Sequence, residues 1–181
     1  VGIDMDEATC EATVRGNCIA SPPANNMCSS SAQLQPGVSV VDSTRNAYFD
    51  DALDDFGCVT KQGPGVWYSI MGTGKTLEVT TCTSGTNYDS QLAVFAGSCE
   101  NLICVTRNDD WCGLQSRVEW LSEAGSMYYI LVHGYAGSVG IFELTVEGET
   151  MKPTPSPTLS PTPSPTQPPT QPPTEPPTEP P

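Results

Sequence analysis

The side chains able to do chemistry in this sequence are carboxylates, thiols and hydroxyls, because it contains a single histidine, His133. Serine hydrolases need a histidine base beside the nucleophile. The stretch GYAGSVG at 134–140 places Ala136 where the GxSxG motif requires its first glycine. His133 also ends an otherwise apolar run that is typical of a strand. We therefore expect a structural role for His133.

Two other enzyme patterns are incomplete as well. The stretch GTGKT at 72–76 resembles the end of a phosphate-binding loop, which has a glycine five positions before its second glycine. That position is Ser69, and the stretch lies between two predicted strands, so we expect a hairpin turn. A glycosidase needs two carboxylates across a cleft, and the order of the residues singles out no such pair. We expect no enzyme.

The thiols are expected to form disulfides. The eight cysteines are Cys10, Cys18, Cys28, Cys58, Cys82, Cys99, Cys104 and Cys112. Their number is even, and no CxxC pair or Cys/His cluster points to zinc. Disulfides are typical of secreted proteins, and the start VGIDMDEATC fits a processed chain. Cys99 and Cys104 flank the short segment ENLI, so we expect them to form one pair.

The hydroxyls gather in residues 153–181, which repeat every four residues with proline first and threonine second. Proline fixes φ and lacks an N–H, and it drives the preceding residue into the extended region. Polyproline II is therefore expected, and in it four residues turn the chain by about one third of a turn. Successive threonines then point in three directions around a rod.

Tracts rich in threonine, serine and proline are typical of O-glycosylated stalks. No N-linked sequon occurs, so any glycan is expected to be O-linked. The expected sites are Thr154, Ser156, Thr158, Ser160, Thr162, Ser164, Thr166, Thr170, Thr174 and Thr178. An unmodified linker is one alternative. A ligand for SH3- or WW-type domains is another, although only Lys152 would supply a basic anchor.

The net charge of the chain excludes some classes of binding partner. The 181-residue chain has a formal net charge of −14, and residues 1–150 hold nineteen acidic and six basic side chains. Phosphate contacts need a basic patch, so nucleic acid is not expected. An anionic membrane surface would repel this domain, and no apolar run of about 18 residues predicts a membrane span.

Strand signals dominate the rest of the chain. They cover 38–43, 66–71, 75–82, 91–97, 102–107, 116–122, 127–135 and 140–148. Their spacing of about ten residues predicts an all-β, antiparallel, jelly-roll-like sandwich. A short helix is expected within 6–19. We divide the chain into a disulfide-bonded N-terminal segment (1–35) that belongs to the globular domain, a β-sandwich (36–150) and a polyproline II tail (151–181).

Six phrases, in order, resemble the bacterial pre-peptidase C-terminal (PPC) domain and its extracellular eukaryotic relatives. They are VWYSI (66–70), TTCTSGTNYDSQLAVFAGSC (80–99), CVTRNDDWCG (104–113), SRVEW (116–120), AGSMYYILVHGY (124–135) and GIFELTV (140–146). The resemblance implies a non-catalytic sandwich appended to secreted proteins. The tail separately resembles the proline- and threonine-rich glycoproteins of algal walls and glycan-coated fibrils with tetrapeptide repeats.

The resemblance also implies a cation site. Some PPC domains bind calcium, and the resemblance places Asp89 near Asp109 and Asp110. Calcium takes six to eight oxygen ligands, whereas aspartates that cap loop turns without a metal are the alternative. On the same basis, Cys82 and Cys112 are expected to pair beside these loops. Elimination then leaves Cys18 with Cys28 and Cys10 with Cys58.

Four aromatic residues in loops or at strand ends are candidates for docking a proline rod. They are Trp111, Tyr135, Tyr48 and Phe49. We expect a secreted structural glycoprotein of an extracellular matrix, wall or fibril, with the sandwich as connector and the tail as rod. Its partners would be matrix or wall glycans, or copies of itself in a head-to-tail fibre. The alternative is a non-catalytic module that binds carbohydrate or protein and sits on a stalk attached to a secreted hydrolase.

Overall fold

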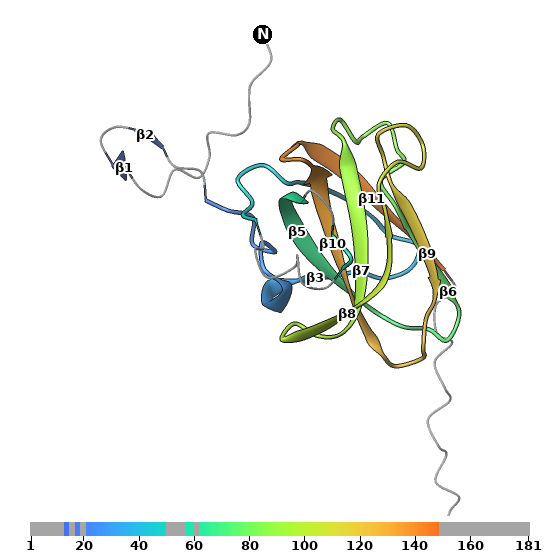
Figure 1. Cartoon of the computed structure of the whole chain (residues 1–181). Helices are drawn as coiled ribbons and strands as arrows, with labels where there is room; N and C mark the ends of the chain where they lie inside the picture. Colours follow the sequence, from blue (N-terminus) through green and yellow to red (C-terminus); the bar gives the residue numbers. More distant parts are fainter. Residues whose placement is uncertain (1–12, 15–16, 19–20, 50–56, 60–61, 149–181) are drawn as a thin grey trace, which may run out of the picture. The chain divides into compact units, whose positions relative to one another are not determined.

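The computed structural model describes residues 13–14, 17–18, 21–49, 57–59 and 62–148 (Figure 1). The chain divides into two compact units, Val1–Met151 and Lys152–Pro181. The second unit holds the tail, so the expected polyproline II conformation and all ten glycosylation sites lie outside the described residues. Within the described part, no helix is long and apolar enough to cross a membrane.

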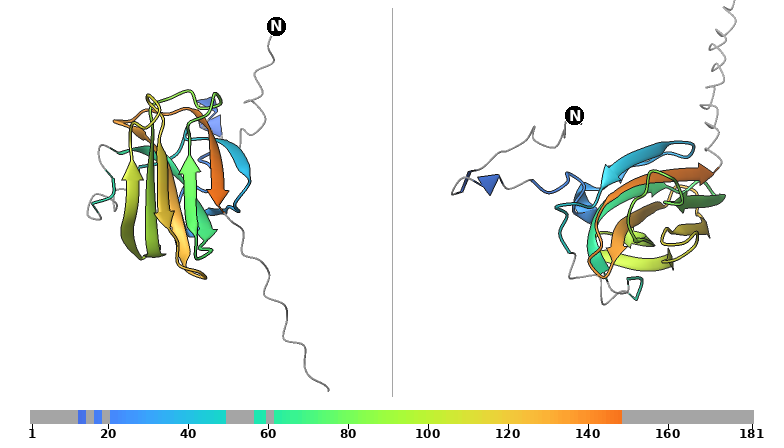
Figure 2. Two further views of the ribbon diagram at one scale, coloured as in Figure 1. Left: turned by 90° about the vertical axis from the view of Figure 1, so that its right-hand side faces the viewer. Right: turned by 90° about the horizontal axis from the view of Figure 1, so that it is seen from above.

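Two sheets build the domain. The five-stranded sheet has the order β3 (Ala32–Gln33), β5 (Gln62–Met71), β10 (Met127–Tyr135), β7 (Ser90–Ser98) and β8 (Asn101–Asn108). The four-stranded sheet has the order β4 (Ser39–Ser43), β11 (Ile141–Gly148), β6 (Thr76–Thr80) and β9 (Arg117–Leu121). All neighbouring strands are antiparallel except β3, which runs parallel to β5. Figure 2 shows the two sheets curving around a shared interior.

The alternation of apolar and polar residues explains this arrangement. In β11, Phe142, Leu144 and Val146 are buried, while the side chains between them face outward. β10 is apolar on both faces and takes the central position between β5 and β7. An all-β, disulfide-bonded sandwich is therefore confirmed, and each of the eight predicted strands is present.

Apolar side chains pack on both faces of the five-stranded sheet. Between the sheets, Tyr68, Val94 and Ile130 pack against Phe142 and Leu144. On the other face, Trp67, Phe95 and Leu131 are covered by the segments that carry Cys28, Cys58 and Val59. This second cluster gives the five-stranded sheet a covering layer, which the segments around Cys28 and around Cys58 and Val59 supply.

Two local predictions are wrong. The helix expected within 6–19 is contradicted by a two-stranded sheet of β1 (Thr13–Val14) and β2 (Asn17–Cys18), with Val14 opposite Asn17. The β-branched pair Thr13–Val14 and the intervening Gly16 favour a hairpin over a helix. The only helical element of the described part is the single 3-10 turn η2 (Cys28–Ser30).

The hairpin turn expected at 72–76 is instead a crossover, because β5 and β6 belong to different sheets. Gly72 allows its segment to lie close to the segment that carries Glu123, since a Cβ on Gly72 would lie 2.1 Å from the carbonyl oxygen of Glu123. The requirement for glycine at position 72 is thus steric, whereas Gly74 has a positive φ of 77°.

The disulfides confirm one predicted pair and correct three. Cys82 bonds to Cys112 as expected, but Cys28 bonds to Cys99 and Cys58 to Cys104. The expected pairs Cys99–Cys104, Cys18–Cys28 and Cys10–Cys58 are therefore wrong, and Cys10 itself lies outside the described residues.

The register of β7 and β8 gives the reason for the first error. Ser98 faces Asn101 and Phe95 faces Cys104, so Cys99 lies four residues beyond the partner of Cys104. Four residues of strand span about 13 Å, whereas bonded cysteines need their Cα atoms within about 7 Å of each other. The two cysteines instead fasten the covering layer to the five-stranded sheet.

Candidate cation site and aromatic groove

Three aspartates meet where β7 begins and β8 ends. Asp89 directly precedes β7, while Asp109 and Asp110 directly follow β8, its antiparallel neighbour. One carboxylate oxygen from each lies within 4.8 Å of those of the other two. The structure thus brings together the three residues that the PPC resemblance implies.

The electrostatics of this cluster suit a cation. Partial burial raises the pKa of Asp89, and the charges of Asp109 and Asp110 raise it further. The Oδ1 atoms of Asp89 and Asp109 are buried and have no hydrogen-bond partner. Calcium ligands lie about 2.3–2.6 Å from the metal, so oxygens this close together can share one ion. The residues present therefore fit calcium.

The loop 109–116 is fastened on several sides. The disulfide from Cys112 to Cys82 ties it to the end of β6. The hydroxyl of Ser116 lies 2.8 Å from the carbonyl oxygen of Ser90 and 3.0 Å from that of Asn108. Thr81 Oγ1 lies 2.8 Å from Ser90 Oγ. Thr81 follows β6, Ser116 precedes β9 and Ser90 is the first residue of β7. No local pattern in the sequence marks these hydroxyls as buried.

A cavity of about 260 Å³ lies beside the cluster. It is lined by Cys58, Gln91, Leu92, Arg107, Asn108, Asp109 and His133. His133 is buried, as expected of a structural residue, and its Nδ1 lies 3.2 Å from the carbonyl oxygen of Gly134. Burial lowers the pKa of His133 to about 4, although the contact with Gly134 and the charge of Asp109 act in the opposite direction. The imidazole is therefore neutral at neutral pH, with Nδ1 as its donor.

The aromatic docking candidates do not form one surface. Tyr48 and Phe49 lie together in a groove of about 390 Å³ that Met27, Cys28, Cys99 and Glu100 also line. Cys99 and Glu100 precede β8, whereas Trp111 lies in the loop that follows β8. Tyr135 is half-buried at the end of β10, and its N–H donates to the carbonyl oxygen of Asp89 (3.0 Å).

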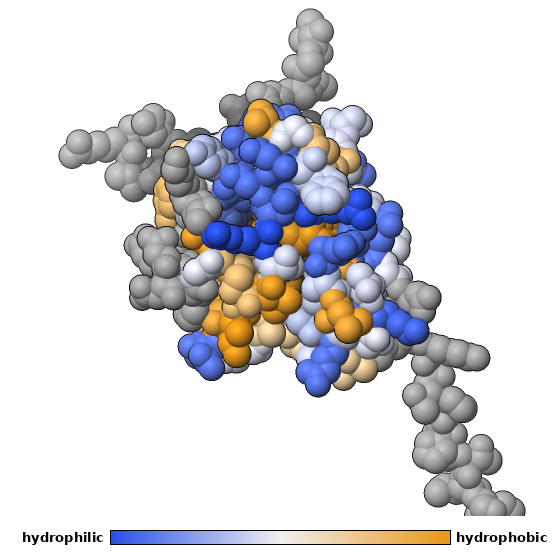
Figure 3. All heavy atoms as spheres, turned by 45° about the vertical axis from the view of Figure 1, so that its right-hand side comes forward, coloured by the Kyte–Doolittle hydropathy of each residue, from blue (hydrophilic) through white to orange (hydrophobic). Residues whose placement is uncertain are grey.

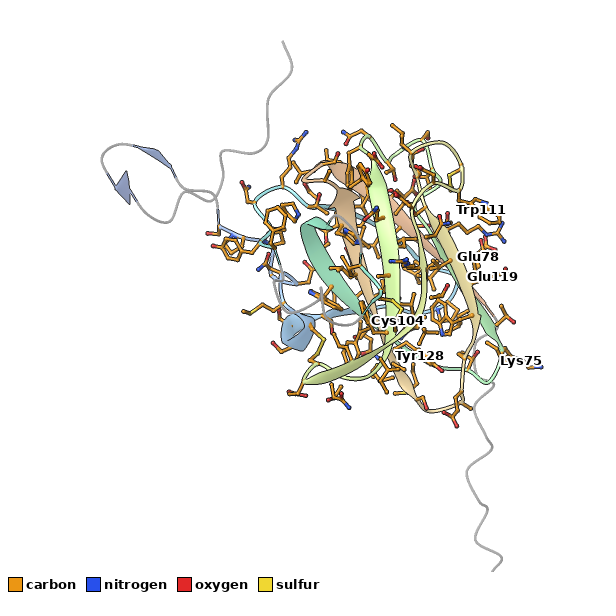
Figure 4. All side chains as sticks on the ribbon, in the orientation of Figure 1. Lys75, Glu78, Cys104, Trp111, Glu119 and Tyr128 are labelled. Carbon is orange, nitrogen blue, oxygen red and sulfur yellow. A yellow bond between two sulfur atoms is a disulfide. The ribbon has the colours of Figure 1, made fainter. Side chains whose placement is uncertain are left out.

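Trp111 has its own surroundings at the edge of the four-stranded sheet. The guanidinium of Arg117 lies 5.3 Å from the centroid of the indole ring, and its Nη2 is 2.5 Å from Glu78 Oε2. Figure 4 shows Trp111 on the same side of the molecule as Glu78 and Glu119. On the face drawn in Figure 3, apolar side chains form small groups among polar ones.

Comparisons with known proteins give only distant likenesses. No protein-family model and no curated protein matches the sequence. Among solved structures, the pre-peptidase C-terminal domain of a collagenase from Bacillus anthracis aligns with a TM-score of 0.42 and 12% identity, over 65% of this chain and 94% of that one. PliG, a periplasmic inhibitor of g-type lysozyme from Aeromonas hydrophila, aligns with a TM-score of 0.41 and 13% identity, over 65% and 96%. Likenesses this distant carry no functional argument, so function must be argued from the chain itself.

Proposed function

We propose that this chain is a secreted structural glycoprotein of an extracellular matrix, wall or fibril. The sandwich is the connector, and the tail is an O-glycosylated rod that docks on the sandwich of a neighbouring copy. The three disulfides among the described residues support an oxidising, extracellular setting. The observation that carries the proposal is the groove at Tyr48 and Phe49, in a chain whose residues 153–181 are a proline-rich repeat.

The groove is exposed and held in shape. Met27, Tyr48 and Phe49 are 62%, 61% and 54% exposed, which is unusual for three large apolar side chains side by side. The N–H of Tyr48 donates to Asn26 Oδ1 (2.7 Å), and its carbonyl oxygen accepts the N–H of Gly65 (3.4 Å). The Cys28–Cys99 disulfide joins the two sides of the groove. A partner therefore meets exposed aromatic side chains on a backbone that is held in place.

The tail has the chemistry that such a groove accepts. Polyproline II segments dock on aromatic-lined grooves, and little conformational entropy is lost because the rod is already stiff. The later repeats, 165–181, carry paired prolines in place of serine. They leave fewer hydroxyls for glycans, so we assign the docking contact to them. A tail that docks on the next copy builds a heterologous, head-to-tail contact, which extends into a fibre when it does not close.

The test compares the native full-length chain with the double variant Tyr48→Ala/Phe49→Ala. Electron microscopy and sedimentation should show fibres or larger oligomers for the native chain and monomers for the variant. Leu121→Ala is the matched control, because Leu121 is an exposed apolar residue on the four-stranded sheet. A native chain that stays monomeric at high concentration, or a double variant that assembles normally, contradicts the docking.

The glycan coat is tested separately by intact-mass spectrometry before and after glycan release. We expect a mass above that of the bare sequence, with the excess mapping to the threonines of the tail. A mass equal to that of the unmodified polypeptide would contradict O-glycosylation of the tail, and the docking test would be unaffected.

Trp111 favours a second candidate, a non-catalytic module that binds carbohydrate. Its indole is 60% exposed and is flanked by the charged groups of Arg117 and Glu78. An exposed aromatic ring with polar neighbours offers a stacking surface that is apolar at its centre and wet at its edge. Glycan-array binding of the full chain that disappears in Trp111→Ala supports this candidate. Binding that persists in the variant contradicts it.

A further inference from the structure

Buried oxygens without partners gather at one place in the domain. Seven buried side-chain polar atoms of the described residues lack a hydrogen-bond partner, and three of them are Asp89 Oδ1, Gln91 Oε1 and Asp109 Oδ1. All three are acceptors, because amide and carboxylate oxygens carry no proton at neutral pH. A buried acceptor without a donor costs free energy, so this set favours a ligand that is positively charged or rich in donors.

Gln91 is the member that the sequence did not indicate. It is only 3% exposed, and it lines the same cavity as Asp109. Leu92, the next residue, faces Asn108, which directly precedes Asp109. In this antiparallel pair, Gln91 therefore lies opposite Asp109, and residues opposite each other have their side chains on the same face of the sheet. Asp89, two residues before Gln91, has a carboxylate oxygen within 4.8 Å of one on Asp109.

We propose that Gln91 Oε1 is a fourth, buried ligand oxygen in a site for one hard divalent cation held by Asp89, Asp109 and Asp110. Three carboxylates and a neutral amide oxygen form an all-oxygen set, which suits calcium with water or loop carbonyls completing its coordination. Arg107 lines the cavity too, but within the described residues no ion pair joins it to these acids. The cation would connect the start of β7 to the loop that follows β8.

The fold holds these oxygens together before the cation arrives. The Cys82–Cys112 disulfide and the Ser116 hydroxyl fix the loop that carries Asp109 and Asp110. Like charges held this close repel one another, so a cation that neutralises them would stabilise the loop. This inference does not depend on the function of the tail, and its failure would leave the proposed rod and groove untouched.

The test uses the full chain and calcium chloride. We expect heat of binding in titration calorimetry, and a melting temperature that rises with calcium and falls with a chelator. Asp109→Asn should abolish both effects. Gln91→Leu should weaken binding by about tenfold or more, the scale of losing a group that supports a metal site, whereas Glu119→Gln, an exposed acid elsewhere, should change nothing.

Gln91→Leu also separates a ligand from a structural side chain. In chelator the variant should melt at or above the temperature of the native chain, because it removes a buried oxygen that has no partner. A variant that is less stable in chelator and binds calcium normally assigns Gln91 to the core and overturns the proposal. A native chain that gives no heat and no shift in melting with millimolar calcium overturns it as well.

A second readout comes from Trp111, which directly follows Asp110. Terbium, a luminescent substitute for calcium, should be sensitised by this indole in the native chain, and calcium should quench the emission by competition. Emission that is absent, or unchanged in Asp109→Asn, contradicts a site at these residues.

Discussion

At the scale of single residues, the side chains that matter most are polar groups buried by the layer over the five-stranded sheet. His133 faces Gly65 on β5 and Gln91 on β7, and it shares its cavity with Arg107 and Asp109. Its imidazole is neutral at neutral pH, because burial lowers its pKa. The one histidine of the chain is thus a probe of the core.

A pH dependence of stability follows from this burial. The pKa of His133 is about 4 in the folded state against 6.5 for the free group, so between these values the unfolded chain binds the extra proton. The free energy of unfolding should therefore fall as pH is lowered from 6.5 to 4, by up to about 3 kcal/mol. Urea denaturation in chelator measures this, and His133→Gln should flatten the slope. Parallel slopes in the two proteins would show that other groups dominate.

Tyr68 and Asp42 make the second residue-scale prediction. The hydroxyl of Tyr68 on β5 donates to Asp42 Oδ2 on β4 (2.6 Å), and so joins the two sheets. Tyr68→Phe should lower the free energy of unfolding by about 1–3 kcal/mol, because a hydrogen bond to a charged acceptor is lost. Tyr129→Phe, in a half-buried position on the same sheet, is the control. Equal losses of unfolding free energy in the two variants would show that the hydrogen bond from Tyr68 to Asp42 adds no stability of its own.

At the scale of elements, the strands could be predicted well from the sequence, whereas the disulfide pairings could not. Alternation of buried and exposed side chains identified β6 and β11, and a doubly apolar run identified β10. These signals are local, so the sequence carries them directly. β3 is only two residues long, and the pairings of Cys28 and Cys58 depend on how the covering layer lies on the sheet. The burial of Gln91 depends on that same layer, so no local sequence pattern could predict it.

The disulfides lead to an element-scale prediction. Replacing Cys82 and Cys112 by serine should speed hydrogen exchange in the loop 109–116 and weaken cation binding, while the groove stays protected. Replacing Cys28 and Cys99 should do the reverse, and each loss should cost about 2–5 kcal/mol of stability. Hydrogen-exchange mass spectrometry distinguishes the two patterns. Uniform loosening in both variants would mean that the domain unfolds as one unit.

At the scale of the whole molecule, a proline-rich repeat and a strongly acidic domain occur in one chain. The formal net charge of −14 makes neighbouring copies repel each other at low ionic strength. Added salt screens this repulsion over about 8 Å at physiological strength. Head-to-tail assembly should therefore increase with sodium chloride, and light scattering can follow it. Assembly that weakens as salt is added would point to ion pairs in place of aromatic docking.

The position of β11 bears on how such a chain withstands pulling. β11 is the last described strand before residues 149–181, and it pairs with β4 on one side and with β6 on the other. Tension applied through the tail would act along this strand. A force along the strand would load two rows of hydrogen bonds in shear, where an edge strand would have one row. The described strand nearest to the tail would thereby resist tension through two strand pairings instead of one.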